Sequence, residues 1–376
     1  SGAGSYELGS VNLNNTGTID VTGGTLNYSS GTGSSTGAVN IASGATWQTG
    51  GGSMVFAAGS TLTNAGTLLS SNGSTTIAEA SAFTGGISLS GGTLTVDAAT
   101  SVAGVFAQSG GTLAGSGNLT LNAVGNTWSS GTWTGSGTTT LDTGASFTAS
   151  GTTTSTVFAG RTLTINGGAS ATFNGDIELE TGSSAITNAG TLTLTGTRLS
   201  HFFNNPGTLD LSNTGTLIKS GAGSYELGSV NLNNTGTLNV TGGTLNYSSG
   251  TFSQNGLIQV ASGATFQKSG GFTNAAIGTI SGSGTIDVGA GNTLTNQGNL
   301  KPGGTGVAGT LSITGNLDNS GTIEAEIGGT TAGTQYDVIA VSGNVTLGGG
   351  TLNSTLINSF VPAGQSFDMI AAGGTA

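Results

Sequence analysis

The sequence predicts an all-β chain that folds as a parallel β-solenoid, a stack of coils whose short strands line up in long sheets. Three observations support this prediction: apolar residues alternate with polar ones over short stretches, a turn motif recurs along the chain, and one segment is duplicated. A period of two indicates strands, and no stretch has the 3.6-residue period of a buried helical face. At roughly 20 residues per coil, we expect a single elongated rod of about 18 coils.

The recurring turn has the pattern Asn-x-Gly-(Thr/Asn)-(Leu/Ile). It begins at Asn15, Asn64, Asn188, Asn205, Asn213, Asn234, Asn296 and Asn319. Asn and Gly adopt left-handed backbone angles at low cost, so each copy predicts a tight corner. A strand follows the corner, as where Leu238 and Val240 point to the face opposite Thr237 and Asn239. One such strand cannot bury its apolar face alone, whereas stacked copies form a continuous core.

Residues 1–52 recur as residues 220–271, so that Ser220 corresponds to Ser1. From Ser1 to Thr32 the first copy differs from the second only in these pairs: Ile19 against Leu238 and Asp20 against Asn239. Because each coil of a solenoid contacts only its neighbours, a segment that begins and ends in step with the coils can be inserted without breaking the stack. The duplication therefore favours a solenoid over a globular domain.

Composition limits the partners that the chain can have. Charged residues make up 6% of the chain, the net charge is −11, and no lysine or arginine precedes Arg161. Nucleic-acid binding needs clustered basic residues, so no nucleic-acid partner is expected. No apolar run is long enough for a transmembrane segment. Cysteine is absent, which excludes disulfides and thiolate metal sites. A surface rich in Ser, Thr, Asn and Gly favours an extracellular or cell-surface, secreted protein.

Three stretches are candidate sites. Trp128 and Trp133 are interpreted as aromatic packing in or beside the core, with a sugar-binding platform as the alternative. Asp176, Glu178 and Glu180 alternate with apolar residues, so their carboxylates share one solvent-facing side of a strand. We interpret these three as an acidic surface patch, with a hydrolase or Ca²⁺ site as the alternative.

The third candidate is a contact loop in the least repetitive part of the chain. It comprises Arg198, His201, Phe202 and Phe203, and it includes the single histidine of the sequence. Loops that leave a solenoid carry most of its variation, so this segment is the best sequence-based candidate for contact with a partner. No residue is assigned a catalytic, cofactor-binding or metal-binding role.

The chain changes character from about residue 299. The segment contains Leu-Lys-Pro-Gly-Gly from Leu300, Gly-Thr-Leu-Ser-Ile from Gly309, Gly-Thr-Ile-Glu-Ala-Glu-Ile from Gly321, Gln-Tyr-Asp-Val-Ile from Gln335 and Phe-Val-Pro-Ala-Gly from Phe360. This succession resembles the C-terminal passenger stretch of bacterial autotransporter-like, β-strand-repeat surface proteins. The resemblance implies a right-handed parallel β-helix, exported from a bacterium to the cell surface or beyond. We therefore divide the chain into a repetitive β-helix body, residues 1–298, and a passenger-type segment, residues 299–376, continuous with it.

The expected function is that of a structural or adhesive surface protein: a rigid stalk, an adhesin or a matrix filament subunit. No enzyme is expected, because the sequence has no phosphate-loop lysine motif and no His-Glu-x-x-His motif. The string Gly33-Ser34-Ser35-Thr36-Gly37 fits a nucleophile elbow by its letters, but an elbow also needs a strand-to-helix turn and a histidine partner. Two alternatives remain open, a β-helical polysaccharide-binding or polysaccharide-cleaving protein and an ice-binding solenoid. The second is suggested by threonine pairs at Thr93/Thr95, Thr138/Thr140, Thr162/Thr164 and Thr191/Thr193.

Partners are expected at the ends of the solenoid. The first copy of the duplicated segment has the sequence of a coil that follows another coil, as residues 220–251 follow residues 200–219. An uncovered coil exposes unpaired backbone groups and apolar residues. We therefore expect head-to-tail self-association or continuation in a longer polypeptide, together with cell-surface or polysaccharide contacts and no cofactor.

Overall fold

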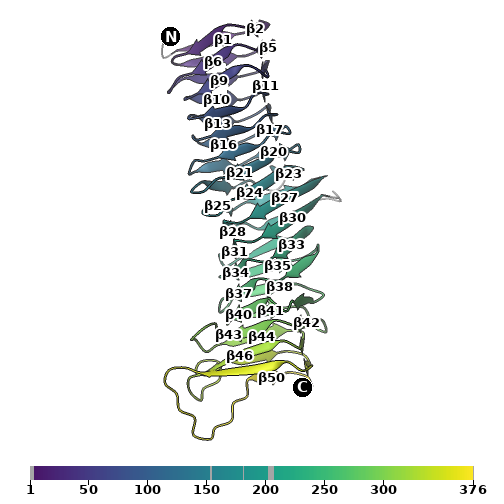
Figure 1. The fold of residues 1–376 in the computed structure, drawn as a ribbon. Helices are drawn as coiled ribbons and strands as arrows, with labels where there is room; N and C mark the ends of the chain where they lie inside the picture. The colour runs from purple at the N-terminus through teal and green to yellow at the C-terminus, as the bar shows by residue number, and fades with distance from the viewer. Residues whose placement is uncertain (1–3, 153–154, 181, 202–206, 376) are drawn as a thin grey trace. The chain divides into compact units, whose positions relative to one another are not determined.

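The computed structural model describes residues 4–152, 155–180, 182–201 and 207–375. Across these residues it contains fifty strands of three to six residues and no helix, which confirms the predicted all-β fold. The strands pair in parallel, and a strand pairs with the one three places further along the chain (Figure 1). Each coil therefore contributes one strand to each of three rows. Row 1 begins with β1 (Ser5–Leu8), row 2 with β2 (Leu13–Asn15) and row 3 with β3 (Thr18–Val21).

The next strands along the chain are β4 (Thr25–Tyr28), β5 (Thr32–Ser35), β6 (Ala38–Ile41), β7 (Thr46–Thr49), β8 (Ser53–Phe56), β9 (Thr61–Asn64), β10 (Thr67–Ser70), β11 (Ser74–Ile77), β12 (Ser81–Phe83), β13 (Gly86–Leu89), β14 (Thr93–Val96), β15 (Thr100–Val102), β16 (Phe106–Gln108), β17 (Thr112–Ala114), β18 (Leu119–Leu121), β19 (Asn126–Trp128), β20 (Gly131–Thr134), β21 (Thr138–Leu141), β22 (Ser146–Ala149), β23 (Thr156–Ala159), β24 (Thr162–Ile165), β25 (Ser170–Phe173), β26 (Asp176–Leu179), β27 (Ser183–Asn188), β28 (Thr191–Leu194), β29 (Arg198–His201) and β30 (Thr208–Asn213). They are followed by β31 (Thr216–Lys219), β32 (Ser224–Leu227), β33 (Val230–Asn234), β34 (Thr237–Val240), β35 (Thr244–Tyr247), β36 (Phe252–Gln254), β37 (Leu257–Val260), β38 (Thr265–Gln267), β39 (Phe272–Asn274), β40 (Thr279–Gly282), β41 (Thr285–Asp287), β42 (Thr293–Asn296), β43 (Asn299–Pro302), β44 (Thr310–Thr314), β45 (Asn316–Asn319), β46 (Thr322–Ile327), β47 (Val338–Val341), β48 (Val345–Leu347), β49 (Thr351–Leu356) and β50 (Ile370–Ala372).

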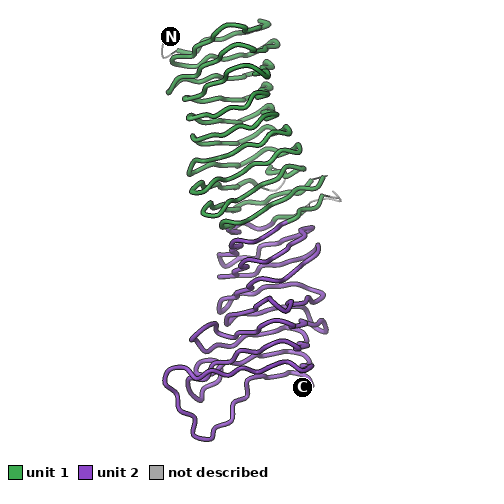
Figure 2. Tube along the Cα trace, viewed as in Figure 1, with its two compact units in different colours: residues 1–192, 199–210 green, residues 193–198, 211–376 purple. Residues whose placement is uncertain are grey.

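The chain divides into two compact units, drawn in different colours in Figure 2. Unit 1 comprises Ser1–Leu192 and Leu199–Asp210, and unit 2 comprises Thr193–Arg198 and Leu211–Ala376. In the described residues row 1 has 17 strands, slightly fewer than the roughly 18 coils expected. The difference arises because later coils are longer: Thr25 pairs with Thr46 in unit 1, whereas Thr322 pairs with Thr351 in unit 2.

The predicted alternation is present in the strands. Leu238 and Val240 are fully buried in β34, while Thr237 and Asn239 between them remain half-buried on the outer face. In unit 1 the interior also holds the two tryptophans, whose rings stack with centroids 4.5 Å apart at an interplanar angle of 14°. Both tryptophans are fully buried, so the packing interpretation of this pair is confirmed.

The corners form for a different reason from the one expected. Among the described residues, none of the asparagines or glycines of the Asn-x-Gly motif has a positive φ. Left-handed angles occur instead in Ser-Gly-Ala turns, as at Gly44 and Gly263. The motif glycine is needed because adjacent coils approach closely there: a Cβ on Gly236 would lie 2.2 Å from the carbonyl oxygen of Gly215. The expectation of left-handed motif corners was therefore wrong, and close contact between coils explains the glycine.

Buried amide side chains form a ladder in row 3 of unit 2, and four of its six members are asparagines of the motif. Its rungs are Asn213, Asn234, Gln254, Asn274, Asn296 and Asn319, all of which are buried. In four of the five steps a side-chain amide donates to the oxygen of the next rung, for example over 2.7 Å from Asn213 to Asn234 and 2.6 Å from Asn296 to Asn319. A buried amide is costly unless it is hydrogen-bonded, so these bonds satisfy the amide groups that take part in them and tie successive coils together.

The duplicated segment repeats its contacts as well as its sequence. Tyr28 and Tyr247 each donate their phenol hydroxyl to a backbone carbonyl of the preceding coil, and Ser29 and Ser248 each donate to a glutamate of that coil. The surroundings nevertheless differ: Tyr6 of β1 is 53% exposed, whereas Tyr225, its equivalent in β32, is fully buried. Burial of this coil therefore depends on the coil beside it.

The two copies also occupy different rows. The first copy starts in row 1 with β1, which pairs with β4. The second copy starts with β32, which pairs with β35 in row 2. The duplicated length is therefore in step with the strands but not with whole coils. This outcome corrects the expectation that the copies begin in step with the coils.

Candidate functional site

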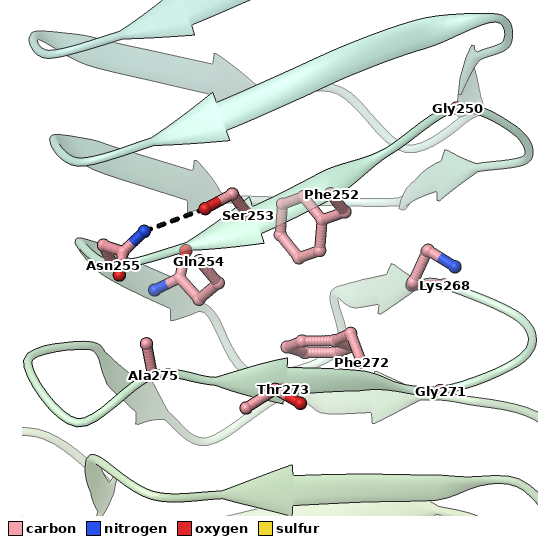
Figure 3. A pocket seen from close by; sticks show the side chains of 10 residues that line it. All are labelled: Gly250, Phe252, Ser253, Gln254, Asn255, Lys268, Gly271, Phe272, Thr273 and Ala275. Atoms are coloured by element: carbon pink, nitrogen blue, oxygen red, sulfur yellow. Dashed lines mark hydrogen bonds between the residues drawn. The ribbon is translucent and has the colours of Figure 1, made fainter.

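An open pocket lies in row 3 of unit 2, between the adjacent strands β36 and β39. These two strands share a single register pair, Gln254 with Asn274, whereas β33 with β36 and β39 with β42 each share three. The sheet is thus opened at this level, and the opening has a volume of about 340 Å³ (Figure 3). Gly250 and Gly271 line it with positive φ values of 109° and 77°, where the chain turns into each strand.

Phe252 of β36 and Phe272 of β39 supply the apolar side of the pocket. The rings of Phe252 and Phe272 meet edge to face, with centroids 5.3 Å apart at 71°, and both side chains are half-buried (Figure 3). Phe252 also packs against Tyr247 and Phe266, at centroid distances of 5.3 and 5.5 Å. The rings are therefore fixed by the interior on one side while the other side faces the pocket.

Polar groups complete the lining. The Lys268 ammonium donates to the carbonyl of Ser269 at 3.1 Å and lies 5.7 Å from the centroid of the Tyr247 ring. Burial raises the pKa of Tyr247 to about 12, so this ring stays a neutral phenol beside the ammonium at neutral pH. On the opposite side the Asn255 amide donates to the Ser253 hydroxyl at 2.8 Å (Figure 3).

Lys268 differs from Arg161 and Lys219 in its exposure and from Lys301 in its partners. Arg161 is buried with its guanidinium donating to the Gly117 carbonyl and the Thr139 hydroxyl, and burial lowers its pKa to about 10. Lys219 is buried under backbone carbonyls, and burial lowers its pKa as well. Lys301 pairs with Glu324 at 2.6 Å. Lys268 is half-exposed and, within the described part of the chain, has no carboxylate within ion-pair distance.

The acidic patch has the predicted alternation. Asp176, Glu178 and Glu180 are half-exposed, while Ile177 and Leu179 between them are buried. Asp176 and Glu178 already interact with other residues of the chain. In the described residues no group of three or more acidic or histidine side chains is placed to hold a metal ion. The three carboxylates therefore lie on the outer face of a strand, and none of them lines the pocket between β36 and β39.

The structure describes part of the predicted contact loop. Arg198 begins β29, is half-buried and interacts with other residues of the chain. His201 ends the same strand. Phe202 and Phe203 lie outside the described residues, so the structure places neither of them.

The threonine pairs do not form one array. Two of them are neighbours in row 3, where Thr138 pairs with Thr162 and Thr140 with Thr164. The pair at Thr93 lies on β14 in row 2, and the pair at Thr191 lies on β28 in row 1. An ice-binding face requires the pairs on consecutive coils of one face, so this arrangement does not favour that alternative.

Sequence reasoning missed the pocket, although the duplication contained a signal for it. When the two copies are aligned, Phe252 replaces a glycine, Lys268 replaces a threonine and Phe272 replaces a serine of the first copy. The corresponding residues of the first copy are Gly33, Thr49 and Ser53. These substitutions are far apart in sequence and meet only when the coils stack.

A second polar cluster is buried near the C-terminal coils. Asp337 accepts backbone N–H groups from Gly309 at 2.7 Å and from Glu326 at 2.8 Å. Burial raises its pKa to about 6, and the neighbouring Glu326 carboxylate acts in the same direction. Glu326 itself accepts from the Gly306 N–H at 2.6 Å. Both carboxylates thus fasten the loop between β43 and β44 to strand β46.

No protein-family model matches the chain, and neither the curated proteins nor the solved structures give a match. In the residues that the structure describes, no helix is long and apolar enough to cross a membrane. Fold and site together define a class: a parallel β-solenoid whose stacked coils carry an open pocket with two aromatic rings and one ammonium group.

Proposed function

We propose that the chain is an extracellular structural or adhesive protein that acts as a rigid stalk, an adhesin or a matrix filament subunit without catalytic activity. In this proposal it is a passenger-type, autotransporter-like surface protein of a bacterium. The resemblance of the segment from Leu300 to Phe360 to such proteins supports this finer assignment.

The observation that carries the proposal is the continuity of the hydrogen-bonded rows within each unit. In unit 2, β34 pairs with β37, β37 with β40 and β40 with β43, each over four residues. The buried amide ladder adds side-chain bonds between the same coils. Separating two coils of such a unit requires breaking the backbone hydrogen bonds of several strand pairs together. A unit of this kind resists mechanical load, as a stalk or filament must.

The proposal includes head-to-tail association with another copy or continuation in a longer polypeptide. A coil of another copy, or a further coil of a longer polypeptide, placed against β1 would bury Tyr6 in the way that Tyr225 is buried in β32. The two residues have the same neighbours in sequence, but Tyr225 has strand β29 of the preceding coil beside it, and the two copies lie in different rows.

The test is to label intact cells that produce the protein with antibodies against unit 2, and to compare their attachment with that of cells lacking the gene. We expect surface labelling without permeabilisation and weaker attachment after deletion. Labelling only after permeabilisation contradicts the proposal. Incubation of the purified protein with acidic and neutral polysaccharides should release no product, and release that depends on Asp176, Glu178 and Glu180 would show an enzyme.

A further inference from the structure

We propose that the pocket between β36 and β39 is a binding site for an acidic saccharide, with a uronate ring packed against the aromatic pair Phe252 and Phe272 and its carboxylate bound by Lys268. The site requires no catalysis and does not depend on where the protein is located. It goes beyond a structural role, because it assigns a ligand class to specific residues.

The aromatic pair supplies the affinity for a sugar ring. The apolar C–H face of a pyranose packs on aromatic rings, and aromatic side chains contribute large contact areas at small conformational cost. Phe252 and Phe272 are held by their edge-to-face contact and by Phe266 behind them, at 5.5 and 5.8 Å. The rings therefore do not have to be ordered when a ligand enters.

Lys268 supplies the preference for an acidic sugar. It is half-exposed at the rim of the pocket and has no carboxylate partner in the described residues, so its ammonium can still bind an anion. The net charge of −11 acts against any anion at long range, yet at physiological salt charges beyond about 8 Å are largely screened. The Lys268 ammonium then dominates the electrostatic interaction with a bound anion. A carboxylate in contact with it gains a charge-assisted hydrogen bond.

Hydrogen-bonding groups are placed for sugar hydroxyls. Ser253, Asn255 and Thr273 line the pocket with hydroxyl and amide groups beside the two rings (Figure 3). A volume of about 340 Å³ is at the small end of ligand sites, which suits one or two sugar units of a longer polymer. The open side lets such a polymer continue out of the pocket.

The first copy of the duplication is an internal comparison. There Gly33, Thr49 and Ser53 stand in place of the two phenylalanines and the lysine, so that copy has neither aromatic rings nor a cation at these positions. Packing of the solenoid does not require the pocket residues, because the first copy forms the same type of coil without them.

The experiment titrates the whole protein by calorimetry with trigalacturonate and with its methyl-esterified form at about 0.15 M salt. We expect binding of the acid and weaker binding of the ester. Lys268→Thr, which restores the residue of the first copy, should weaken trigalacturonate binding roughly 10-fold and leave ester binding unchanged. Phe272→Ser should remove binding of both probes.

The control is Lys301→Thr, which removes an equal charge at the ion pair with Glu324. It should leave both affinities unchanged. Circular dichroism of every variant establishes that the coils are intact, and Lys268→Thr keeps the proposal testable if Phe272→Ser does not fold. Absence of trigalacturonate binding, equal binding of acid and ester, or an unchanged affinity in Lys268→Thr would each overturn the proposal.

Discussion

Gly17 and Gly236 occupy the same position in the two copies of the duplicated segment, yet an added methyl group would meet different surroundings. At Gly17 no atom lies within 4 Å of an ideal Cβ, whereas at Gly236 the Gly215 carbonyl oxygen would lie 2.2 Å away. Neither glycine has a positive φ. The sequence shows that a glycine recurs here, but the cause at Gly236 is a contact with the preceding coil, which local propensity does not contain.

Gly236→Ala should therefore destabilise unit 2 by about 1–3 kcal/mol, because the backbone of the adjacent coil must move. Gly17→Ala is the matched control and should change the stability of unit 1 by less than about 1 kcal/mol, in the favourable direction. Urea unfolding midpoints of both variants check the prediction. Equal losses in the two variants would mean that the glycine serves its own backbone and not the contact between coils.

Asp337 gives a pH-dependent term at a single residue. Burial raises its pKa from the ordinary 3.8 to about 6, so between these values the folded chain holds a proton that the unfolded chain has released. Protonation of Asp337 therefore adds to the free energy of unfolding as the pH falls from about 6 towards 4, and this stabilisation is lost as the pH rises through 6. The free energy of unfolding changes with pH by at most about 1.4 kcal/mol per pH unit from this one group.

Asp337→Asn replaces the titrating carboxyl group with an amide of the same size that does not titrate in this pH range. The difference in thermal midpoint between wild type and Asp337→Asn should increase from pH 7 to pH 4.5, in favour of wild type. Asp20→Asn serves as a control, since the second copy carries Asn239 at the equivalent position. A difference that is constant with pH would show that Asp337 does not titrate in this range.

At the scale of elements, the amide ladder has one irregular rung. Gln254 accepts from Asn234 at 2.8 Å but donates to the Gly256 carbonyl, and the Asn274 side-chain oxygen beyond it has no hydrogen-bond donor. An asparagine at this rung would donate to Asn274, as Asn274 itself donates to Asn296 at 2.8 Å. The longer glutamine side chain therefore interrupts the ladder at the pocket.

Gln254→Asn should stabilise unit 2 by about 1 kcal/mol, because it supplies a partner to a buried oxygen. Asn296→Ala, which removes a rung with partners on both sides, should destabilise it by a larger amount. Chemical unfolding followed by far-ultraviolet circular dichroism measures both. A loss of stability in Gln254→Asn would show that the donor to Gly256 matters more than continuity of the ladder.

The strands were predictable because the alternation of apolar and polar residues is a local property of the sequence. Leu238 and Val240, for example, are buried as expected. The pocket was not, because Phe252, Lys268 and Phe272 come from three separate strands or turns and meet only through the register of the coils. The interior position of the tryptophans was predictable from their lack of charged neighbours. Right-handedness of the solenoid stays a prediction.

At the scale of the whole molecule, the optical probes separate the two units. All three tryptophans, Trp47, Trp128 and Trp133, lie in unit 1, whereas strands fill both units. In a solenoid each coil is stabilised by its neighbours, so distant parts can unfold at different denaturant concentrations. Tryptophan fluorescence therefore reports unit 1, while circular dichroism reports the entire chain.

We expect fluorescence and circular dichroism to give different urea midpoints for the wild type. Gly236→Ala should shift the circular dichroism transition to lower urea and leave the fluorescence midpoint in place. Coincident curves for both proteins would mean that the units unfold as one cooperative block.

The displacement of the second copy by one row has a genetic consequence. A crossover between the coding stretches of the two nearly identical copies would excise one copy together with everything between the two, while leaving a continuous coil sequence at the junction. Every strand after the junction would then move to the preceding row, because β32 would take the place of β1. The shorter allele would carry Phe252, Lys268 and Phe272 intact but would turn their pocket to another side of the solenoid.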